Sequence, residues 1–400
     1  MDRVLISSVG TGDIKKDSRG SYEETLYVLD GKEYRESLTS KVIISHYHIE
    51  RMILIGTVKS MWDSFYVEYG GEDDEYLSLL ERRKEDGSLR EEDLEKLQEL
   101  LNSYLGSEGS RCILIDYTRN DSEEMWENFE KLLEIRSRLD GGDRVILDIT
   151  HGFRYIPILN IFLLEVLRSM DKEKFEIEAI LYGMFGDNRS DIIDFKIFFD
   201  LLDWIKALNA FKEYSNADQL SLLLEKESSA KDAHRVFSQF SKNLQMANIH
   251  ALWRFAKGIS KKIAAIERSD NKVLKLLSED FSDIAKRLDK ETQSAFQYEL
   301  AVWLYESKNY ALSYIVLYEA IITKVCEQMG YDLHNHEERE EAKKHVDAPF
   351  NRFFNTKFPD SISVIRNCIV HQCEERRDMV EQDIKRLKKF LDEFRIFIER

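Results

Sequence analysis

The sequence predicts an α/β domain followed by an all-helical region, and three observations support this fold class. Short runs of β-branched and aliphatic residues alternate with helical stretches as far as about residue 195. Two such runs with a helix between them imply a parallel sheet, because parallel neighbours need a crossover connection. After residue 195 no strand pattern recurs, and apolar residues follow helical spacing instead. We therefore expect a Rossmann-like domain in residues 1–195 and helices beyond it.

Composition limits the classes of protein that the sequence can encode. A chain of 400 residues implies two or three domains, and 43% hydrophobic with 33% charged residues is typical of globular proteins. The formal net charge of −17 argues against a broad surface that coats nucleic acid. Residues 291–400 carry 16 basic and 20 acidic residues, so most of the negative excess precedes them. Any contact with RNA is therefore expected to be local and C-terminal.

Apolar and cysteine patterns point to a cytoplasmic protein. No apolar stretch approaches the length of a membrane span, and a strand-like run follows the first residues directly, so we expect neither membrane segment nor signal peptide. The four cysteines lack paired metal-ligand spacing and the density of a disulfide scaffold, so we interpret them as buried thiols. They are Cys112, Cys326, Cys368 and Cys373.

The first predicted strand, residues 4–9, ends in a turn of small residues, Gly10-Thr11-Gly12. Such a turn lets backbone N–H groups approach a phosphate or a nucleotide edge. It lacks the full GxGxxG pattern and is therefore a poor dinucleotide signature. A hairpin around Asp30-Gly31 and a buried strand over residues 52–57 follow, and Thr57 ends that strand in another small-residue turn. The acidic residues 72–105 are interpreted as a solvated helical insertion.

Two further strands, residues 111–117 and 144–150, flank a helical stretch. The second runs into His151-Gly152-Phe153-Arg154 and then a long apolar helix, so Thr150, His151 and Arg154 should stand at the carboxyl edge of the sheet. Open α/β sheets bind ligands at that edge. A helix cap with a surface arginine is the alternative, but this polar cluster is denser than a cap needs. A last strand over residues 176–182 completes the domain.

The helical region divides into a connecting part, residues 196–290, and a C-terminal domain, residues 291–400. Within the second part, residues 293–305 and 310–329 resemble a helical hairpin. The final helix carries an apolar seam for packing on another helix or another chain. Its residues are Val380, Ile384, Leu387, Leu391, Phe394 and Ile398.

The run from Arg366 to His371 places a guanidinium and an imidazole close together in an apolar stretch. An arginine can stabilise charge that develops on a phosphate, and a histidine can move protons near neutral pH, so the pair could serve attack by a ribose 2′-OH without a metal. Similar pairs occur elsewhere in the chain, so the spacing alone is weak. Ser361 is a plausible N-cap for the helix, and residues 350–372 have a local basic excess.

Five residues on an ideal helix separate Arg366 from His371 by about 140° around the axis. Either the helix ends between them, or two copies of the chain complete each other's site. An amphipathic helix with an incidental ion-pairing arginine and a capping histidine remains the structural alternative. Two histidine groups elsewhere lack recognised metal-ligand spacing and are interpreted as polar surface. They are His46 with His48, and His334 with His336 and His345.

Taken together, the first turn, the Asp148–Arg154 run and the Arg366–His371 run resemble the CRISPR-associated CARF–HEPN ribonucleases of type III systems. Residues 55–63 resemble that family's second strand and turn. The resemblance covers nearly the whole chain, and the Asp148–Arg154 run is its most specific part. It implies a CARF sensor domain that binds cyclic oligoadenylate across a two-fold dimer axis. It also implies an all-α HEPN domain that cleaves single-stranded RNA without metal or cofactor.

The resemblance also assigns roles to residues. Arg366 and His371 match the catalytic pair, and Asn367 fills the polar position that follows the arginine. The ring-shaped activator would face residues of the two turns and of the second strand's end. These are Gly10, Thr11, Gly12, Thr57, Thr150, His151, Gly152 and Arg154.

The expected partners are single-stranded RNA, cyclic oligoadenylate and further copies of the chain as a homodimer or higher homo-oligomer, with no membrane and no DNA. The alternative function is a non-catalytic nucleotide-sensing module whose helical domain binds a protein or regulates transcription. The sequence leaves open the ring size of the activator, the RNA sequence preference and any slow degradation of the activator.

Overall fold

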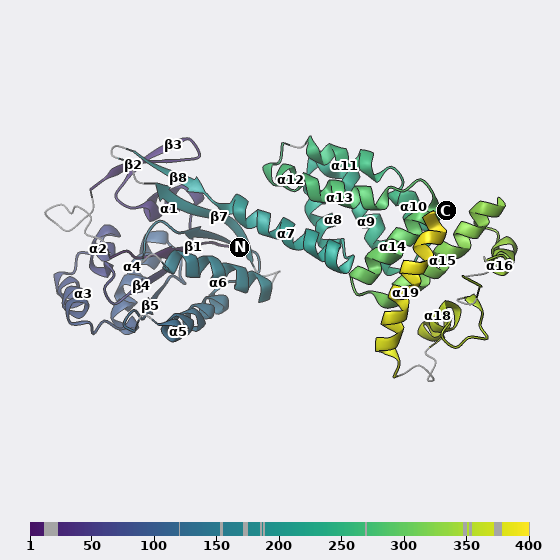
Figure 1. Ribbon diagram of the computed structural model, residues 1–400. Helices are drawn as coiled ribbons and strands as arrows, with labels where there is room; N and C mark the ends of the chain where they lie inside the picture. The colour runs from purple at the N-terminus through teal and green to yellow at the C-terminus, as the bar shows by residue number, and fades with distance from the viewer. Residues whose placement is uncertain are drawn as a thin grey trace. The chain divides into compact units, whose positions relative to one another are not determined.

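The computed structural model describes residues 1–11, 23–119, 121–152, 155–170, 175–184, 186, 189–268, 270–346, 350–351, 354–371 and 378–399 (Figure 1). The chain divides into two compact units, Met1–Phe199 and Asp200–Arg400. The division falls within helix α7 (Lys196–Tyr214). A boundary near residue 290 stays a prediction.

An eight-stranded sheet forms the centre of the first unit, in the order β3-β2-β8-β7-β6-β1-β4-β5. β7, β6, β1, β4 and β5 are parallel, while β8 and β3 run antiparallel to β7 and β2. The expected α/β domain is therefore confirmed. The strands are β1 (Arg3–Ser8), β2 (Thr25–Leu29), β3 (Lys32–Glu36), β4 (Arg51–Thr57), β5 (Arg111–Ile115), β6 (Asp143–Asp148), β7 (Phe175–Met184) and β8 (Ser190–Asp194).

Helices cover both faces of this sheet (Figure 1). Alternate strand residues face opposite sides, so Leu5 packs in one core cluster while Val4 and Ile6 pack in the other. The Leu5 side is covered by α1 (Thr39–Tyr47), α2 (Trp62–Glu68), α3 (Asp74–Asp86), η1 (Glu91–Leu94) and α4 (Glu95–Leu105). The other side is covered by α5 (Ser122–Leu132), η2 (Leu133–Arg138) and α6 (Ile156–Met170).

Residues 72–105 are helical as expected, but they are not a solvated insertion. Leu94, Leu97 and Leu101 have no exposed surface and belong to the core on the Leu5 side of the sheet. The segment connects β4 to the parallel strand β5, and such a connection must cross over a face of the sheet. Its acidic residues therefore form the outer surface of a structural layer.

The β2–β3 hairpin turns at Asp30 and Gly31, whose φ angles are 49° and 75°. Two successive left-handed residues suit the tight turn that matches strand twist, and this confirms the predicted hairpin. Sequence reasoning assigned neither helix α1 nor strand β8. β8 pairs with both β7 and β2 and so joins the hairpin to the rest of the sheet.

The second unit is helical throughout its described residues, as expected. Residues 230–266 form three helices and not one continuous helix, because the chain turns at Ala247 and Gly258, both with positive φ. The helices after α7 are α8 (Asp218–Glu225), η3 (Ser228–Ala230), α9 (Lys231–Gln245), α10 (Ile249–Ala256), α11 (Ile259–Glu267), α12 (Lys272–Leu276), α13 (Ser278–Leu288), α14 (Gln293–Glu306), α15 (Tyr310–Met329), α16 (His336–Lys344), α18 (Ile362–His371) and α19 (Val380–Glu399).

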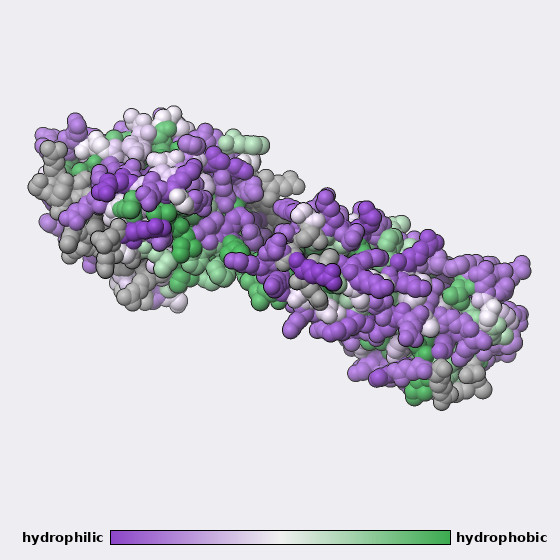
Figure 2. Space-filling view, turned by 90° about the horizontal axis from the view of Figure 1, so that it is seen from above, coloured by the Kyte–Doolittle hydropathy of each residue, from purple (hydrophilic) through white to green (hydrophobic). Residues whose placement is uncertain are grey.

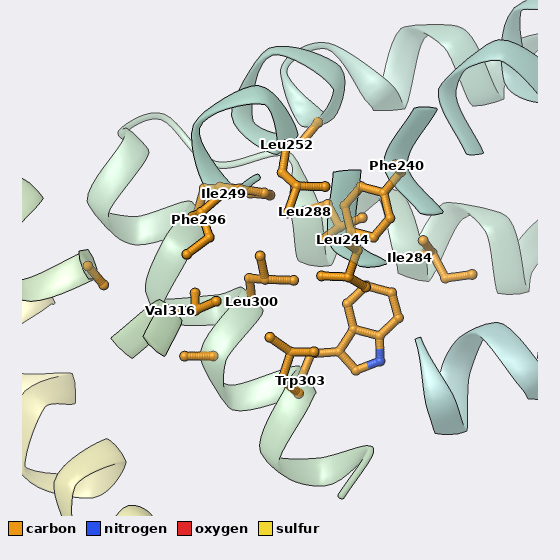
Figure 3. Close-up of a cluster of buried hydrophobic side chains, with 14 of the residues drawn as sticks. Phe240, Leu244, Ile249, Leu252, Ile284, Leu288, Phe296, Leu300, Trp303 and Val316 are labelled. Carbon is orange, nitrogen blue, oxygen red and sulfur yellow. The ribbon is translucent and has the colours of Figure 1, made fainter. Parts of the chain in front are cut away.

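One apolar core runs through the second unit (Figure 3). Aromatic side chains meet edge to face within it, as at Phe211 and Trp303, whose ring centroids are 4.8 Å apart. The seam of α19 packs inside the same unit, because Leu387, Leu391 and Phe394 are buried in this core. That seam is therefore used within the chain.

Hydrophilic side chains cover most of the visible face of each unit (Figure 2). Among the residues that the structure describes, no helix is long and apolar enough to span a membrane.

Candidate functional site

The turns that follow β1, β4 and β6 meet at the carboxyl edge of the sheet. β1 lies between β4 and β6, and the Met61 amide donates to the Gly10 carbonyl oxygen at 2.9 Å. A Cβ atom added at Gly10 would lie 3.7 Å from the Gly152 backbone nitrogen. The strand order reverses direction around β1, and open α/β sheets bind ligands in the crevice at such a point. The predicted turns after β1 and β6 are thus neighbours.

Thr57 is buried at this edge of the sheet. Its side chain is 2% exposed, and its hydroxyl lies 3.4 Å from Ser60 Oγ. Ser60 Oγ accepts a hydrogen bond from the Thr57 amide and donates one to the Val9 carbonyl oxygen, each at 2.9 Å. The structure therefore places the Thr57 side chain within the scaffold of the first two turns, with little surface left for a ligand.

Asp148, at the end of β6, ties the third turn to β1. Its carboxylate accepts from Ser7 Oγ at 2.9 Å on one oxygen and from the Thr150 amide at 2.9 Å on the other. The residue is fully buried. A buried carboxylate that is hydrogen-bonded on both oxygens fixes geometry, so Asp148 holds the turn that carries Thr150 and His151.

The Thr150 hydroxyl accepts from the Gly183 amide at 2.9 Å. Beside it, His151 Nε2 lies 3.5 Å from Thr39 Oγ1. Burial lowers the pKa of His151, and the charge of Asp148 opposes this shift. Burial therefore favours the neutral form of His151, whose imidazole can form a hydrogen bond with an oxygen or nitrogen atom of a ligand. Thr39, at the start of α1, was not expected here, because sequence reasoning had assigned no helix to that segment.

Gly152 has a φ of +113°, which side-chain-bearing residues rarely adopt. A Cβ atom there would lie 2.9 Å from Ser8 Cβ. The turn therefore requires glycine, and it brings backbone against β1. Of the predicted ligand-contact residues, Gly10, Thr150, His151 and Gly152 lie together, and Thr11 follows Gly10 directly. Gly12 and Arg154 lie outside the described residues.

In the second unit, α18 runs through both Arg366 and His371. The Val364 amide donates to Ser361 Oγ at 3.2 Å, so Ser361 caps the helix as predicted. Of the two alternatives for this pair, a helix that ends between Arg366 and His371 is excluded, because helical hydrogen bonding continues through His371. On one helix the two side chains leave the axis about 140° apart, so a single chain does not bring them together.

The Arg366 guanidinium lies over the Tyr318 ring, 5.1 Å from its centroid. Its Nη1 donates to Asn367 Oδ1 at 3.0 Å. Its Nε is buried without a hydrogen-bond partner among the described residues. His371 is exposed at the helix end. Arg366 is therefore held by an aromatic face and an amide while it keeps an unused donor, which suits an anionic ligand.

No group of histidine, cysteine and acidic side chains within the described ranges could hold a metal ion. His46 Nδ1 lies 2.8 Å from the Tyr34 hydroxyl, and the His334 ring packs against that of His250. Cys112 and Cys326 are buried and Cys368 is half-buried, while Cys373 lies outside the described residues.

Residues 4–186 match the family model of the CARF domain of the CRISPR system endoribonuclease Csx1. Residues 200–295 match that of the second domain of CRISPR-associated protein MJ1674. The protein of that name from Methanocaldococcus jannaschii is 29% identical over 350 residues, which cover 82% of this chain and 54% of the relative. The chain thus spans about half the length of that curated relative.

A weaker similarity links the chain to Enterococcus italicus Csm6, whose structure was solved with cyclic hexa-2′-fluoro-hexa-dAMP. The TM-score is 0.45 at 11% identity, with 100% of this chain and 94% of that chain covered. A TM-score at this level carries no structural argument. The family model that matches the first unit and the curated relative both describe CRISPR-associated proteins. The sheet order, with its switch point at β1, fits the Rossmann-like fold expected of a CARF domain. The chain is therefore similar to CARF-containing CRISPR-associated proteins.

Proposed function

We propose that the chain is an endoribonuclease of type III CRISPR defence that cyclic oligoadenylate activates and that cleaves single-stranded RNA without a metal ion. The match of residues 4–186 to the CARF domain of a CRISPR endoribonuclease carries this proposal. The meeting of the Gly10 and Gly152 turns at the sheet's switch point supports it. Arg366, with its unused donor, supports the nuclease part.

The edge of the first unit suits a ring of nucleotides because it offers backbone and small side chains. Gly10 has no side chain, so phosphates and ribose edges can approach the main chain there, while Gly152 lets its turn pack closely against Ser8 of β1. Thr150 and His151 supply a hydroxyl and an imidazole. Arg154, which lies outside the described residues, is proposed from the sequence as the charged contact to a phosphate.

The helical unit suits RNA cleavage only if two chains cooperate. Because α18 continues through His371, Arg366 of one copy needs the imidazole of a second copy. We infer a homodimer in which both Arg366–His371 runs line a shared groove, since a two-fold interface is the commonest way to bring identical helices together. Arg366 would stabilise charge on the phosphate, while His371 would move protons during attack by the 2′-OH.

Cleavage of labelled single-stranded RNA in EDTA tests the reaction, with and without cyclic tetra- and hexa-adenylate. We expect cleavage only with an activator, products that end in a 2′,3′-cyclic phosphate, and no cleavage of DNA, which lacks the hydroxyl. Loss of activity in EDTA that Mg²⁺ or Mn²⁺ restores would contradict the metal-independent reaction.

Sedimentation tests the dimer. We expect at least a dimer at micromolar concentration, and mixing Arg366→Ala chains with His371→Ala chains should restore part of the cleavage that each lacks alone. Full specific activity in a monomer would contradict the shared groove.

A non-catalytic sensor whose helical unit binds a protein is the second candidate. The separation of Arg366 and His371 on one helix favours it, because a single chain then has no assembled catalytic pair. RNA cleavage distinguishes the two candidates. A sensor alone would bind cyclic oligoadenylate and leave RNA intact at every protein concentration.

A further inference from the structure

Arg366 borders a pocket of about 390 Å³ in the second unit. Its polar lining includes side chains from α10, α14, α16, α18 and the turn before α16. Among them are His250, Gln293, Gln297, His334, Arg339 and Arg366. Pockets that hold small organic ligands have volumes of roughly 300–1,000 Å³, so this one can accept a single nucleotide.

Two buried polar atoms at this pocket lack hydrogen-bond partners among the described residues. They are Arg366 Nε and Gln297 Oε1. Gln297 is only 3% exposed, and a buried polar atom without a partner is costly, so native structures rarely keep one without a reason. A ligand that accepts from Arg366 and donates to Gln297 would satisfy both atoms at once.

The charges around the pocket favour an anion. Arg339 already donates to Glu319, Thr323 and the Leu333 carbonyl oxygen. That ion pair neutralises Glu319, the acidic residue of the lining. Arg366 is thus the lining cation with an unused donor, and its position over Tyr318 holds the guanidinium in place.

The histidines close one side of the pocket. The His250 and His334 rings meet edge to face with centroids 4.2 Å apart. Burial lowers the pKa of His250, and the neighbouring His334, Arg254 and Arg339 lower it further. His250 Nε2 lies 3.4 Å from Arg254 Nη2, from which it accepts, so the neutral ring keeps Nδ1–H as a donor to a ligand. An aromatic wall of this kind also suits a flat base.

The floor of the pocket is rigid. Ile249 lines the pocket and also belongs to the apolar cluster that contains Phe296 and Val316 (Figure 3). Gln297 follows Phe296 on α14, so core packing fixes the position of the amide. A rigid amide with one donor group and one acceptor atom can distinguish base edges, because a wrong base leaves one of its groups unpaired.

We propose that this pocket receives one nucleotide of the RNA strand, with its phosphate on Arg366 and its base edge on Gln297, and thereby sets which base the chain prefers beside the cut. This inference rests on the proposed cleavage of RNA for the identity of the strand. The pocket itself can be tested without cleavage, so the two proposals can fail separately.

The binding test uses the full chain and the 3′-monophosphates of adenosine, guanosine, cytidine and uridine, with inorganic phosphate as a fifth probe. We expect one nucleotide to bind more tightly than the other three and than phosphate. Gln297→Met keeps the size of the side chain, and it should reduce the preference among the four nucleotides by at least about fivefold. His334→Ala, at an exposed position, provides a second variant that should weaken all four nucleotides.

Matched controls are Gln382→Met on α19 and His345→Ala, both exposed and outside the pocket lining. They should leave every affinity unchanged. Equal binding of the four nucleotides to the wild-type chain, or an unchanged preference in Gln297→Met together with unchanged affinities in His334→Ala, would overturn the inference.

A cleavage test separates RNA from the activator as the source of the nucleotide. RNAs that differ at one base beside the cut should be cleaved at different rates by the wild-type chain, and at more similar rates by Gln297→Met. The half-maximal concentration of cyclic tetra- and hexa-adenylate should stay the same. A shift in that concentration with an unchanged base preference would assign the pocket to the activator and contradict the inference.

Discussion

The two candidate sites of this protein are built in different ways. At the sheet edge of the first unit, Asp148 and Ser60 form hydrogen bonds with other parts of the protein, and Gly10 and Gly152 allow their turns to approach each other and β1 closely. At the pocket of the second unit, Arg366 and Gln297 keep buried polar atoms without partners among the described residues. The first site is a scaffold for main-chain contacts, whereas the second offers side-chain groups.

This difference indicates how each site should respond to substitution. A scaffold fails when its backbone geometry is lost, so its glycines and buried carboxylate matter more than any single contact. A site of individual side chains loses the function of the group that is removed while the fold persists. The four predictions that follow test this contrast, from the largest expected effect to the smallest.

Arg366→Ala and His371→Ala should each reduce RNA cleavage by about 100-fold or more, the usual range for a lost general acid or base or a lost charge stabiliser. Both residues lie on α18, and neither occurs in the first unit, so activator affinity and oligomeric state should not change. Initial rates and activator titrations measure this. His345→Ala on the exposed surface is the control, and cleavage by either catalytic variant at the rate of this control would contradict the assignment.

Gly152→Ala should destabilise the first unit by about 1–3 kcal/mol for the strained backbone alone. The added Cβ would also meet Ser8 at 2.9 Å, and the same displacement should abolish activator binding. Denaturant unfolding and direct binding measure the two effects.

Gly141→Ala is the matched control, since a Cβ atom there meets nothing within 4 Å and its φ is not in the left-handed region. It should stay close to the wild type in both measurements. Wild-type activator affinity in Gly152→Ala would show that the turn does not hold the ligand.

Arg154→Ala should raise the activator concentration for half-maximal cleavage by at least about tenfold, because one charge-assisted contact is worth roughly 1.5–3 kcal/mol. The maximal rate should change less, since Arg366 and His371 are untouched. Arg144→Ala, at the opposite end of β6, removes an exposed ion pair with Glu178 and serves as the control. Normal activator binding combined with no cleavage at any concentration would instead place Arg154 in signal transmission or catalysis.

The smallest expected effect is on the pH dependence of stability. Burial lowers the pKa of His151 in the folded chain, so below the ordinary histidine value of about 6.5 the unfolded chain binds this proton more readily. The contribution of the neutral imidazole is therefore present above that pH and is lost as the pH falls. The free energy of unfolding should decrease more steeply between pH 6.5 and 5 in the wild type than in His151→Gln. Equal slopes would contradict the role of burial.

The sequence was sufficient to predict that the turns of the first candidate site lie together, because they follow strand ends. Parallel strands bring their carboxyl ends to one edge of a sheet, so the residues after 4–9 and 144–150 had to lie at the same edge. The pattern of alternating apolar runs thus determined the division into an α/β part and a helical part, and it placed Gly10, Thr150, His151 and Gly152.

Local pattern did not determine how deeply each residue is buried. Thr57 ends a strand as expected, yet its side chain lies inside the scaffold because Ser60 and Trp62 fold back over it. The acidic composition of residues 72–105 predicts a solvated insertion, although Leu94, Leu97 and Leu101 of this segment cover the sheet. A helix in a solvated insertion and a helix that covers the sheet both have an acidic outer face and an apolar inner face with the same helical period. The period therefore cannot distinguish the two arrangements.

Only the tertiary structure brought His250, Gln297, His334 and Arg366 to one pocket. The sequence treated His334 as polar surface and gave no signal for Gln297, since a glutamine in a helix is unremarkable by itself. It also left open whether the helix ends between Arg366 and His371, which the unbroken α18 settles. Parallel strands in one sheet always bring their carboxyl ends to the same edge, so the turns that follow them meet there. Helix faces meet according to packing angles and rotations that depend on many distant side chains at once.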